Sequence, residues 1–238
     1  MRRALTAAAV TLALAASGCG GDDSEDQPAT PGANGTTVAA TAPTTPAEEP
    51  AAKTAGGCEQ VEAPAPREPG KQKKPSEGLD PAKDWSLVVK TNCGDFTVAL
   101  DLDSGPNASA SLVALARSGY FDDTVFHRIV PGFVIQGGDP TASGSGGPGY
   151  KTVDKPPSGA SYTKGVVAMA KTQTEAKGTA GSQFYVVTGA DAGLPPDYAI
   201  VGKVTDGLDV VEKIGKLGDP STEQPTEPVV ISTIEVRN

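Results

Sequence analysis

The stretch that decides the fold of this 238-residue chain is FHRIVPGFVIQGGD, residues 126–139. Apart from its proline and glycines, its apolar residues are all aromatic or β-branched, which is typical of buried strands. Pro131 and Gly132 interrupt the run and predict a turn, because proline fixes one turn angle and glycine adopts conformations that other residues avoid. The stretch therefore predicts two short strands around a tight turn, with Arg128 and Gln136 as polar side chains among apolar ones.

Similar short runs of apolar and β-branched residues occur on both sides of this stretch. One helix is predicted to begin at Pro106 and end before Gly119, and a second, short helix contains Leu208, Val211 and Ile214. Many short strands with two isolated helices predict a mostly β domain, a closed antiparallel barrel with capped ends. The further strand patterns lie at residues 85–90, 94–102, 166–170, 183–188, 200–204 and 229–236.

Composition divides the chain into a globular domain, residues 85–238, and a tether, residues 19–84. The tether is rich in Pro, Ala, Thr, Glu and Gly and has almost no large apolar residues. Burial therefore cannot offset the entropy lost on ordering it, and we expect a disordered spacer. The second segment is long enough to bury a proper core. The net charge of −9 argues against a nucleic-acid partner, which would require a basic face.

Residues 1–18 are predicted to be a signal peptide of the lipoprotein type. A basic start is followed by an apolar run, residues 4–16, that is too short to span a bilayer. The sequence ASGC that ends at Cys19 resembles a bacterial lipobox, in which cleavage precedes the cysteine and lipid is attached to it. Lipid on Cys19 would anchor the protein to the outer face of the cell membrane. An ordinary signal peptide with an incidental cysteine is the alternative.

The two remaining cysteines, Cys58 and Cys93, suggest one disulfide in an exported protein. That disulfide would tie the end of the tether to the start of the domain. Two free thiols are the alternative. With no Cys-x-x-Cys in the chain, thiol exchange and zinc binding are disfavoured.

The domain is poor in conventional catalytic groups. The chain's one histidine, His127, has no partner at catalytic spacing, and no Gly-x-Ser-x-Gly elbow is present. Residues 144–149, GSGGPG, match a dinucleotide-binding pattern, but the prolines that follow prevent the helix that this pattern requires. We expect no metal and no cofactor. The absence of these groups favours a reaction that needs neither proton transfer nor a nucleophile.

The stretch of residues 126–139 resembles the signature of the cyclophilins: Phe-His-Arg, then Pro-Gly-Phe, then Gln-Gly-Gly-Asp. Residues 181–184, GSQF, resemble a second signature of the same family, and the resemblance extends over residues 86–238. It implies a closed eight-stranded antiparallel barrel capped by two helices, and peptidyl-prolyl cis-trans isomerase activity. On spacing alone, a solvent-facing arginine on an edge strand is the favoured interpretation of Arg128, and the resemblance changes it.

A prolyl bond isomerises slowly because amide resonance gives it a barrier of roughly 18–20 kcal/mol. In the twisted transition state the nitrogen gains a lone pair, so a donor aimed at it stabilises that state selectively. A guanidinium suits this task because it stays charged. The resemblance gives the role to Arg128, with Phe133 and Gln136 completing the catalytic set. The substrate-binding positions that it implies are His127, Val134, Ala170, Lys171, Tyr185, Leu194 and Tyr198.

Some positions depart from the family pattern. Gly193 stands where the family often has tryptophan, Tyr185 replaces the usual phenylalanine, and Lys171 replaces the usual asparagine. We therefore expect weaker binding of cyclic-peptide inhibitors. A catalytically weak module or chaperone that binds proline peptides on the same fold is the alternative to an active isomerase, and a solute-binding lipoprotein is disfavoured. We expect a monomer that acts on proline-containing polypeptides and assists the folding of exported proteins.

Overall fold

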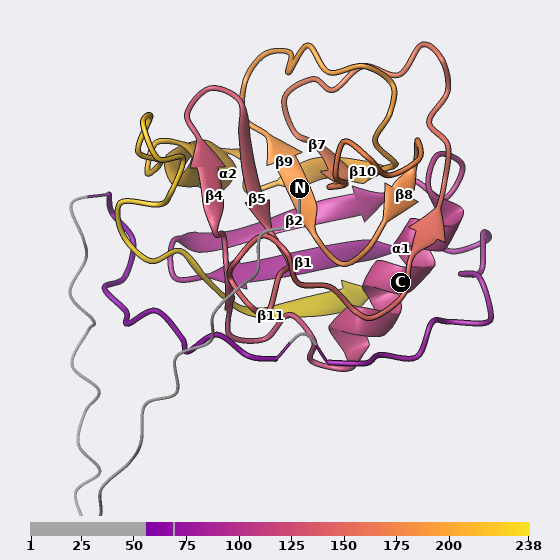
Figure 1. The fold of residues 1–238 in the computed structure, drawn as a ribbon, viewed down its shortest axis with the longest axis horizontal. Coiled ribbons are helices and arrows are strands. Elements are labelled where there is room, and N and C mark those ends of the chain that lie inside the picture. Colours follow the sequence, from indigo (N-terminus) through magenta and orange to yellow (C-terminus); the bar gives the residue numbers. More distant parts are fainter. Residues whose placement is uncertain (1–55, 69) are drawn as a thin grey trace, which may run out of the picture. The chain divides into compact units, whose positions relative to one another are not determined.

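The structure is a computed structural model, and it describes residues 56–68 and 70–238. The predicted signal peptide, Cys19 and the first part of the predicted tether lie outside the described residues. Within them the chain forms one large antiparallel sheet, one small sheet and two helices (Figure 1). No helix of these residues is long and apolar enough to cross a membrane.

The large sheet contains nine strands in the order β3-β11-β1-β2-β10-β7-β9-β5-β4. Figure 1 shows β4, β5 and β9 running across the direction of β1, β2 and β11, so the sheet is strongly curled. A separate pair, β6 and β8, forms the small sheet. The strands are β1 Ser86–Thr91, β2 Gly94–Leu100, β3 Thr124–Val125, β4 Arg128–Val130, β5 Val134–Gly137, β6 Thr152–Val153, β7 Val166–Met169, β8 Thr179–Ala180, β9 Phe184–Val187, β10 Ile200–Asp206 and β11 Val230–Arg237.

The two predicted helices are confirmed as α1, Pro106–Arg117, and α2, Leu208–Gly215. Proline starts α1, where its missing N–H costs nothing. The N-cap residue, Gly105, has no side chain that could cap the helix. The carboxylate of Asp154 caps it instead. The Ala108 amide donates to it at 2.6 Å, and the Asn107 side chain donates to it at 2.6 Å. The helix thereby gains an anionic partner for its N-terminal amides from a segment distant in sequence.

The prediction of a closed eight-stranded barrel is wrong: the sheet is open and has nine strands. One isolated bridge, between Val125 and Asp139, is the only β contact from β3 toward the β5 side in the described residues. The outer edge of β4 is occupied by a loop, because the Ile129 amide donates to the Glu223 carbonyl at 2.8 Å. A strand that would close the sheet has no place there, so the architecture is a curled half-barrel.

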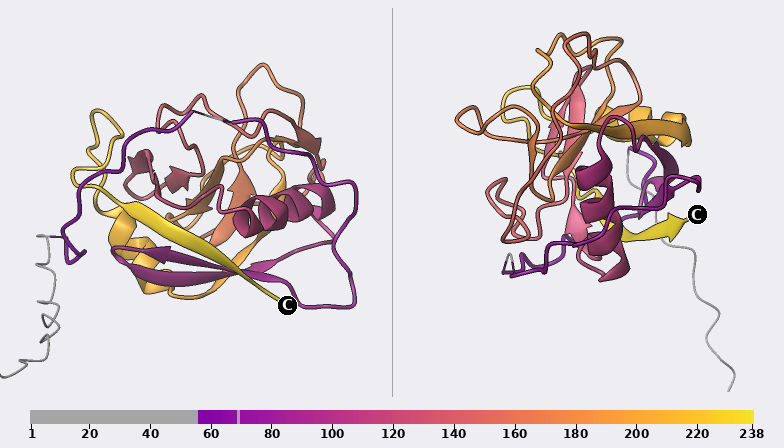
Figure 2. Two further views of the ribbon diagram at one scale, coloured as in Figure 1. Left: turned by 90° about the horizontal axis from the view of Figure 1, so that it is seen from below. Right: turned by 90° about the vertical axis from the view of Figure 1, so that its right-hand side faces the viewer.

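Residues 56–68 and 70–84 run along the outside of the domain rather than away from it (Figure 2). The Arg67 guanidinium donates to the carbonyl of Asp122 at 2.7 Å, and the Gln72 amide donates to the carbonyl of Pro148 at 2.8 Å. These contacts fix a segment that composition alone assigned to the disordered tether. The described part of that tether therefore belongs with the domain.

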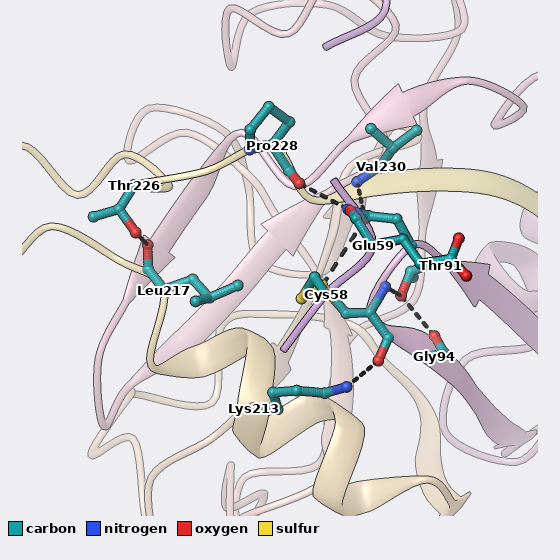
Figure 3. Close-up of a disulfide and its surroundings, with 11 residues drawn as sticks. Cys58, Glu59, Thr91, Gly94, Lys213, Leu217, Thr226, Pro228 and Val230 are labelled. Carbon is teal, nitrogen blue, oxygen red and sulfur yellow. Dashed lines mark hydrogen bonds between the residues drawn. A yellow bond between two sulfur atoms is a disulfide. The ribbon is translucent and has the colours of Figure 1, made fainter. Parts of the chain in front are cut away.

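A disulfide joins Cys58 to Cys93 in the turn between β1 and β2 (Figure 3). It closes a loop with a sequence separation of 35, for which the chain-entropy estimate is roughly 3–4 kcal/mol. Asn92 binds the same segment, because its side-chain amide donates to the Glu59 carbonyl at 2.8 Å and its carbonyl accepts from the Glu59 amide at 2.7 Å. The start of the described chain is thus held by one covalent bond and a pair of hydrogen bonds.

The sheet buries apolar side chains on both faces. Along β9, Phe184 and Val186 join the large core cluster, whereas Tyr185 and Val187 join a smaller cluster on the opposite face. The large cluster packs against α1, and its aromatic rings meet at centroid distances near 6 Å, as between Phe126 and Phe184 at 6.2 Å. The smaller cluster forms the floor of the cavity described next.

Candidate active site

The cross-strand register places the main candidate residues side by side. Arg128 on β4 pairs with Gln136 on β5, and Gln136 pairs with Tyr185 on β9. Tyr185 in turn pairs with Ala168 on β7. Because directly paired residues point to the same face of a sheet, the guanidinium, the amide and the phenol line up in one row over the smaller apolar cluster.

A cavity of about 290 Å³ opens over this row. Its lining combines apolar and aromatic side chains with the polar side chains of Arg128, Gln136 and Lys171. Nine of the ten residues that the sequence assigned to catalysis or substrate binding line it; their individual roles stay predictions. The lining consists of Arg128, Phe133, Val134, Gln136, Ala170, Lys171, Tyr185, Leu194 and Tyr198.

His127 is the one predicted substrate-binding residue that does not line this cavity. It precedes β4, and neither ring nitrogen has a hydrogen-bond partner among the described residues. Burial lowers the pKa of His127 below its ordinary value of 6.5, although the nearby Asp139 acts in the opposite direction. The lowered pKa favours the neutral imidazole near pH 7, and the ring lies close to Gly144 of the glycine-rich loop.

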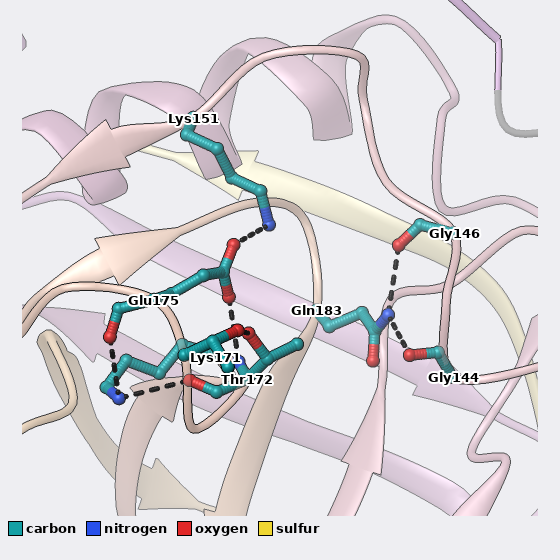
Figure 4. A network of polar contacts seen from close by, with 8 residues as sticks. Gly144, Gly146, Lys151, Lys171, Thr172, Glu175 and Gln183 are labelled. Carbon is teal, nitrogen blue, oxygen red and sulfur yellow. Dashed lines mark hydrogen bonds and ion pairs between the residues drawn. The ribbon is translucent and has the colours of Figure 1, made fainter.

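Among the described residues, the Gln136 side chain makes its hydrogen bond to Gln183 and not to the neighbouring Arg128. Its side-chain nitrogen donates to the Gln183 side chain at 2.9 Å. Gln183 then donates to the carbonyls of Gly144 and Gly146, each at 2.9 Å (Figure 4). Gln136 is thus fixed through Gln183 to the glycine-rich loop, and Gln183 is a supporting residue that the second signature contained without revealing its role.

Asp139, the last residue of the opening stretch, fixes that same loop from its other side. Its carboxylate accepts from the Thr141 amide at 2.8 Å and from the Gly146 amide at 3.0 Å. Burial acts to raise the pKa of Asp139, but the hydrogen bonds from Thr141 and Gly146 outweigh it and the pKa is lowered. Gly146 is required here because a Cβ would lie 2.0 Å from a carboxylate oxygen of Asp139. The GSGGPG pattern is therefore a loop that supports the site.

Arg128 is held by a residue that sequence reasoning missed. Its Nε donates to a carboxylate oxygen of Glu223 at 2.7 Å. Glu223 lies 95 residues further along the chain, in the loop between α2 and β11, and no local pattern marks it as part of a site. Its carbonyl accepts from Ile129 of β4, so the loop is attached to the strand that carries the arginine.

Three tyrosines pack around the floor of the cavity. The ring centroid of Tyr185 lies 6.5 Å from that of Tyr162 and 5.8 Å from that of Tyr198. The Tyr162 hydroxyl donates to the Tyr198 carbonyl at 2.8 Å and accepts from the Tyr198 amide at 3.0 Å. In contrast, the buried Tyr185 hydroxyl has no hydrogen-bond partner among the described residues, and burial raises its pKa.

A second, more polar cavity of about 250 Å³ adjoins the first and shares Gln136, Ala170 and Lys171 with it. Glu175 organises one wall: its carboxylate binds Lys151 at 2.8 Å and accepts from the Thr172 amide at 2.7 Å (Figure 4). Burial acts to raise the pKa of Glu175, but the contacts with Lys151 and Thr172 lower it overall. The lining of this cavity is therefore richer in polar side chains than that of the first.

The rim is open at Gly193. A Cβ there would meet no atom within 4 Å, and the residue has φ +61, which favours glycine. No neighbouring side chain among the described residues takes the place of the tryptophan that the family often has at this position. The space beside Gly193 is therefore open among the described residues, and the weaker binding of cyclic-peptide inhibitors stays a prediction.

The comparisons with known proteins agree with this geometry. Residues 86–236 match the family model described as cyclophilin type peptidyl-prolyl cis-trans isomerase/CLD. The chain therefore belongs to the cyclophilin family of peptidyl-prolyl cis-trans isomerases, and the predicted enzyme class is confirmed.

Two curated relatives illustrate the similarity. Peptidyl-prolyl cis-trans isomerase A of Mycobacterium tuberculosis is 37% identical over 169 residues, which cover 63% of this chain and 91% of the relative. The probable isomerase A of Mycobacterium leprae is 39% identical over the same length and coverage.

Solved structures give the same result. The crystal structure of a cyclophilin type peptidyl-prolyl cis-trans isomerase from Cryptosporidium parvum aligns with a TM-score of 0.61 and 30% identity, covering 66% of this chain and 99% of that one. A crystal structure of that protein in the presence of the dipeptide Ala-Pro aligns with a TM-score of 0.59, also at 30% identity, and covers 64% of this chain and 99% of that one.

Replacing Arg128 by alanine tests its predicted role. We expect kcat/KM for a proline peptide to fall about 100- to 1,000-fold, the usual cost of removing one donor that stabilises a transition state. Exchange between cis and trans signals in NMR spectra measures the rate. Lys90→Ala serves as the control, because Lys90 pairs with Glu235 on β1 and β11 and does not line the cavity. A fully active Arg128→Ala variant contradicts the assignment.

The tyrosine cluster gives a prediction about stability. Tyr185→Phe removes a buried hydroxyl without a partner, so we expect the free energy of unfolding to rise by about 1 kcal/mol. Tyr162→Phe removes a hydroxyl with two hydrogen bonds, so we expect a loss of about 1–2 kcal/mol. Denaturant unfolding of both variants measures the difference. Equal losses in the two variants would show that the Tyr185 hydroxyl has a partner.

Proposed function

We propose that this cyclophilin is exported, anchored through lipid on Cys19, and catalyses prolyl isomerisation in proteins that fold at the outer face of the membrane. The observation that carries the proposal is the sequence of the N-terminus: a basic start, a short apolar run, and the ASGC segment that ends at Cys19. The pairing of Cys58 with Cys93 supports it, because structural disulfides persist mainly in oxidising compartments.

The substrate in this proposal is a proline-containing polypeptide. The apolar part of the slot, formed by Phe133, Leu194 and the Tyr185 ring, receives the proline ring. Arg128 lies at the polar side, where its terminal nitrogens can donate to the twisted prolyl bond. The solved relative in the presence of Ala-Pro supports this substrate class. Partial exclusion of water from the slot strengthens the arginine contact.

The remaining spacer, residues 19–55, gives the domain reach from the membrane in this proposal. The domain acts as a monomer, and no metal or cofactor takes part, because rotation about an amide bond requires neither a nucleophile nor an electron acceptor.

The proposed lipid anchor and membrane location are tested by expressing the full chain and a Cys19→Ser variant in a bacterium. We expect the wild-type protein in the membrane fraction, with mass spectrometry showing lipid on an N-terminal Cys19. We expect the Cys19→Ser variant to lose the lipid and the association with the membrane. A wild-type protein that is recovered without lipid would overturn the proposed anchor and leave the isomerase assignment untouched.

A further inference from the structure

The ion pair between Arg128 and Glu223 lies at the polar side of the substrate slot, and the family assignment does not account for it. Among the described residues, the bond from Nε to Glu223 is the one hydrogen bond of the Arg128 side chain. Both terminal nitrogens of the guanidinium therefore stay available to a bound peptide. The two side chains are partly exposed, at 34% and 45%, so the pair is reached by solvent and its effect is on geometry more than on stability.

Glu223 is held in place with some strain. Its φ of +59 lies in the left-handed region, which is unfavourable for a residue with a side chain. Its amide donates to the carbonyl of Asp219 at 2.8 Å, and the Asp219 carboxylate accepts from the Ser221 and Thr222 amides at 2.7 and 2.9 Å. Such a conformation persists only where the surrounding contacts fix it.

The loop that carries Glu223 is also attached closely to β4. The Glu223 carbonyl accepts from the Ile129 amide at 2.8 Å, one residue beyond Arg128. A Cβ on Gly218 would lie 2.2 Å from the Ile129 carbonyl oxygen, so the backbones of the loop and the strand are in contact. The carboxylate and the guanidinium are thereby positioned by one rigid unit.

We infer that Glu223 is the positioning residue of the isomerase: its carboxylate fixes the plane of the Arg128 guanidinium so that the terminal nitrogens face the substrate slot. Arginine has many rotamers, and one charge-assisted hydrogen bond at Nε removes much of that freedom before substrate binds. Preorganised donors act on the transition state at no reorganisation cost. The inference rests on the catalytic role of Arg128. A masking role, in which the carboxylate blocks the arginine, predicts the opposite effect of its removal.

The test compares Glu223→Ala, Glu223→Gln and Glu212→Ala in the full chain. Glu212 on α2 is a matched control, because it pairs with Lys164 at the same 2.7 Å and with similar exposure, and neither residue lines the cavity. NMR exchange with a proline peptide gives the turnover rate, and titration gives the Kd. We expect Glu223→Ala to lower kcat about tenfold, the order of one lost charge-assisted hydrogen bond, with Kd changed less than about twofold.

Two further results are expected. Glu223→Gln should recover most of the rate, because its amide oxygen still accepts from Nε, and Glu212→Ala should match the wild type. In an Arg128→Ala background, Glu223→Ala should cause no additional loss. An unchanged or faster Glu223→Ala variant overturns the inference, as does a loss that persists without Arg128 or that Glu223→Gln does not relieve. If Arg128→Ala itself keeps full activity, the assignment of the arginine fails instead.

Discussion

The site depends on the antiparallel pairing of β4, β5 and β9. This register places Arg128, Gln136 and Tyr185 in one row on one face of the sheet. A slip of one residue in either pairing would turn the arginine or the amide toward the large core cluster, where an unpaired charge is costly. The Pro131–Gly132 turn sets the first pairing. In the second pairing, β9 contributes apolar side chains to both clusters. The same contacts that stabilise the fold therefore define the active site.

The long loops then fix the polar groups of the row. Glu223 holds the arginine from the loop before β11, and Gln183 connects Gln136 to the carbonyls of Gly144 and Gly146. The loop with Glu223 also occupies the outer edge of β4, which is why the sheet remains open. Two consequences thus share one cause: the loop that prevents closure of a barrel is the loop that supplies the partner of Arg128.

Local patterns were sufficient for much of this molecule. Both helices were predicted from spacing, and the resemblance of residues 126–139 and 181–184 brought nine of ten candidate residues to one cavity. The features that the sequence did not predict depend on contacts between residues far apart in the chain. The open edge of the sheet and the role of Glu223 depend on contacts of Ile129 and Arg128 with Glu223, far away in the sequence. The placement of residues 56–68 and 70–84 depends on hydrogen bonds to loops such as that of Pro148. Composition describes neither kind of contact.

The most direct test of the account is a crystal structure of the domain with a short peptide that contains Ala-Pro. We expect the proline ring between Phe133, Leu194 and the Tyr185 ring, with a terminal nitrogen of Arg128 within hydrogen-bond distance of the prolyl peptide group. Glu223 should remain on Nε in that complex. A proline ring seated in the neighbouring polar cavity, or an Arg128 side chain directed away from the peptide, would contradict the account.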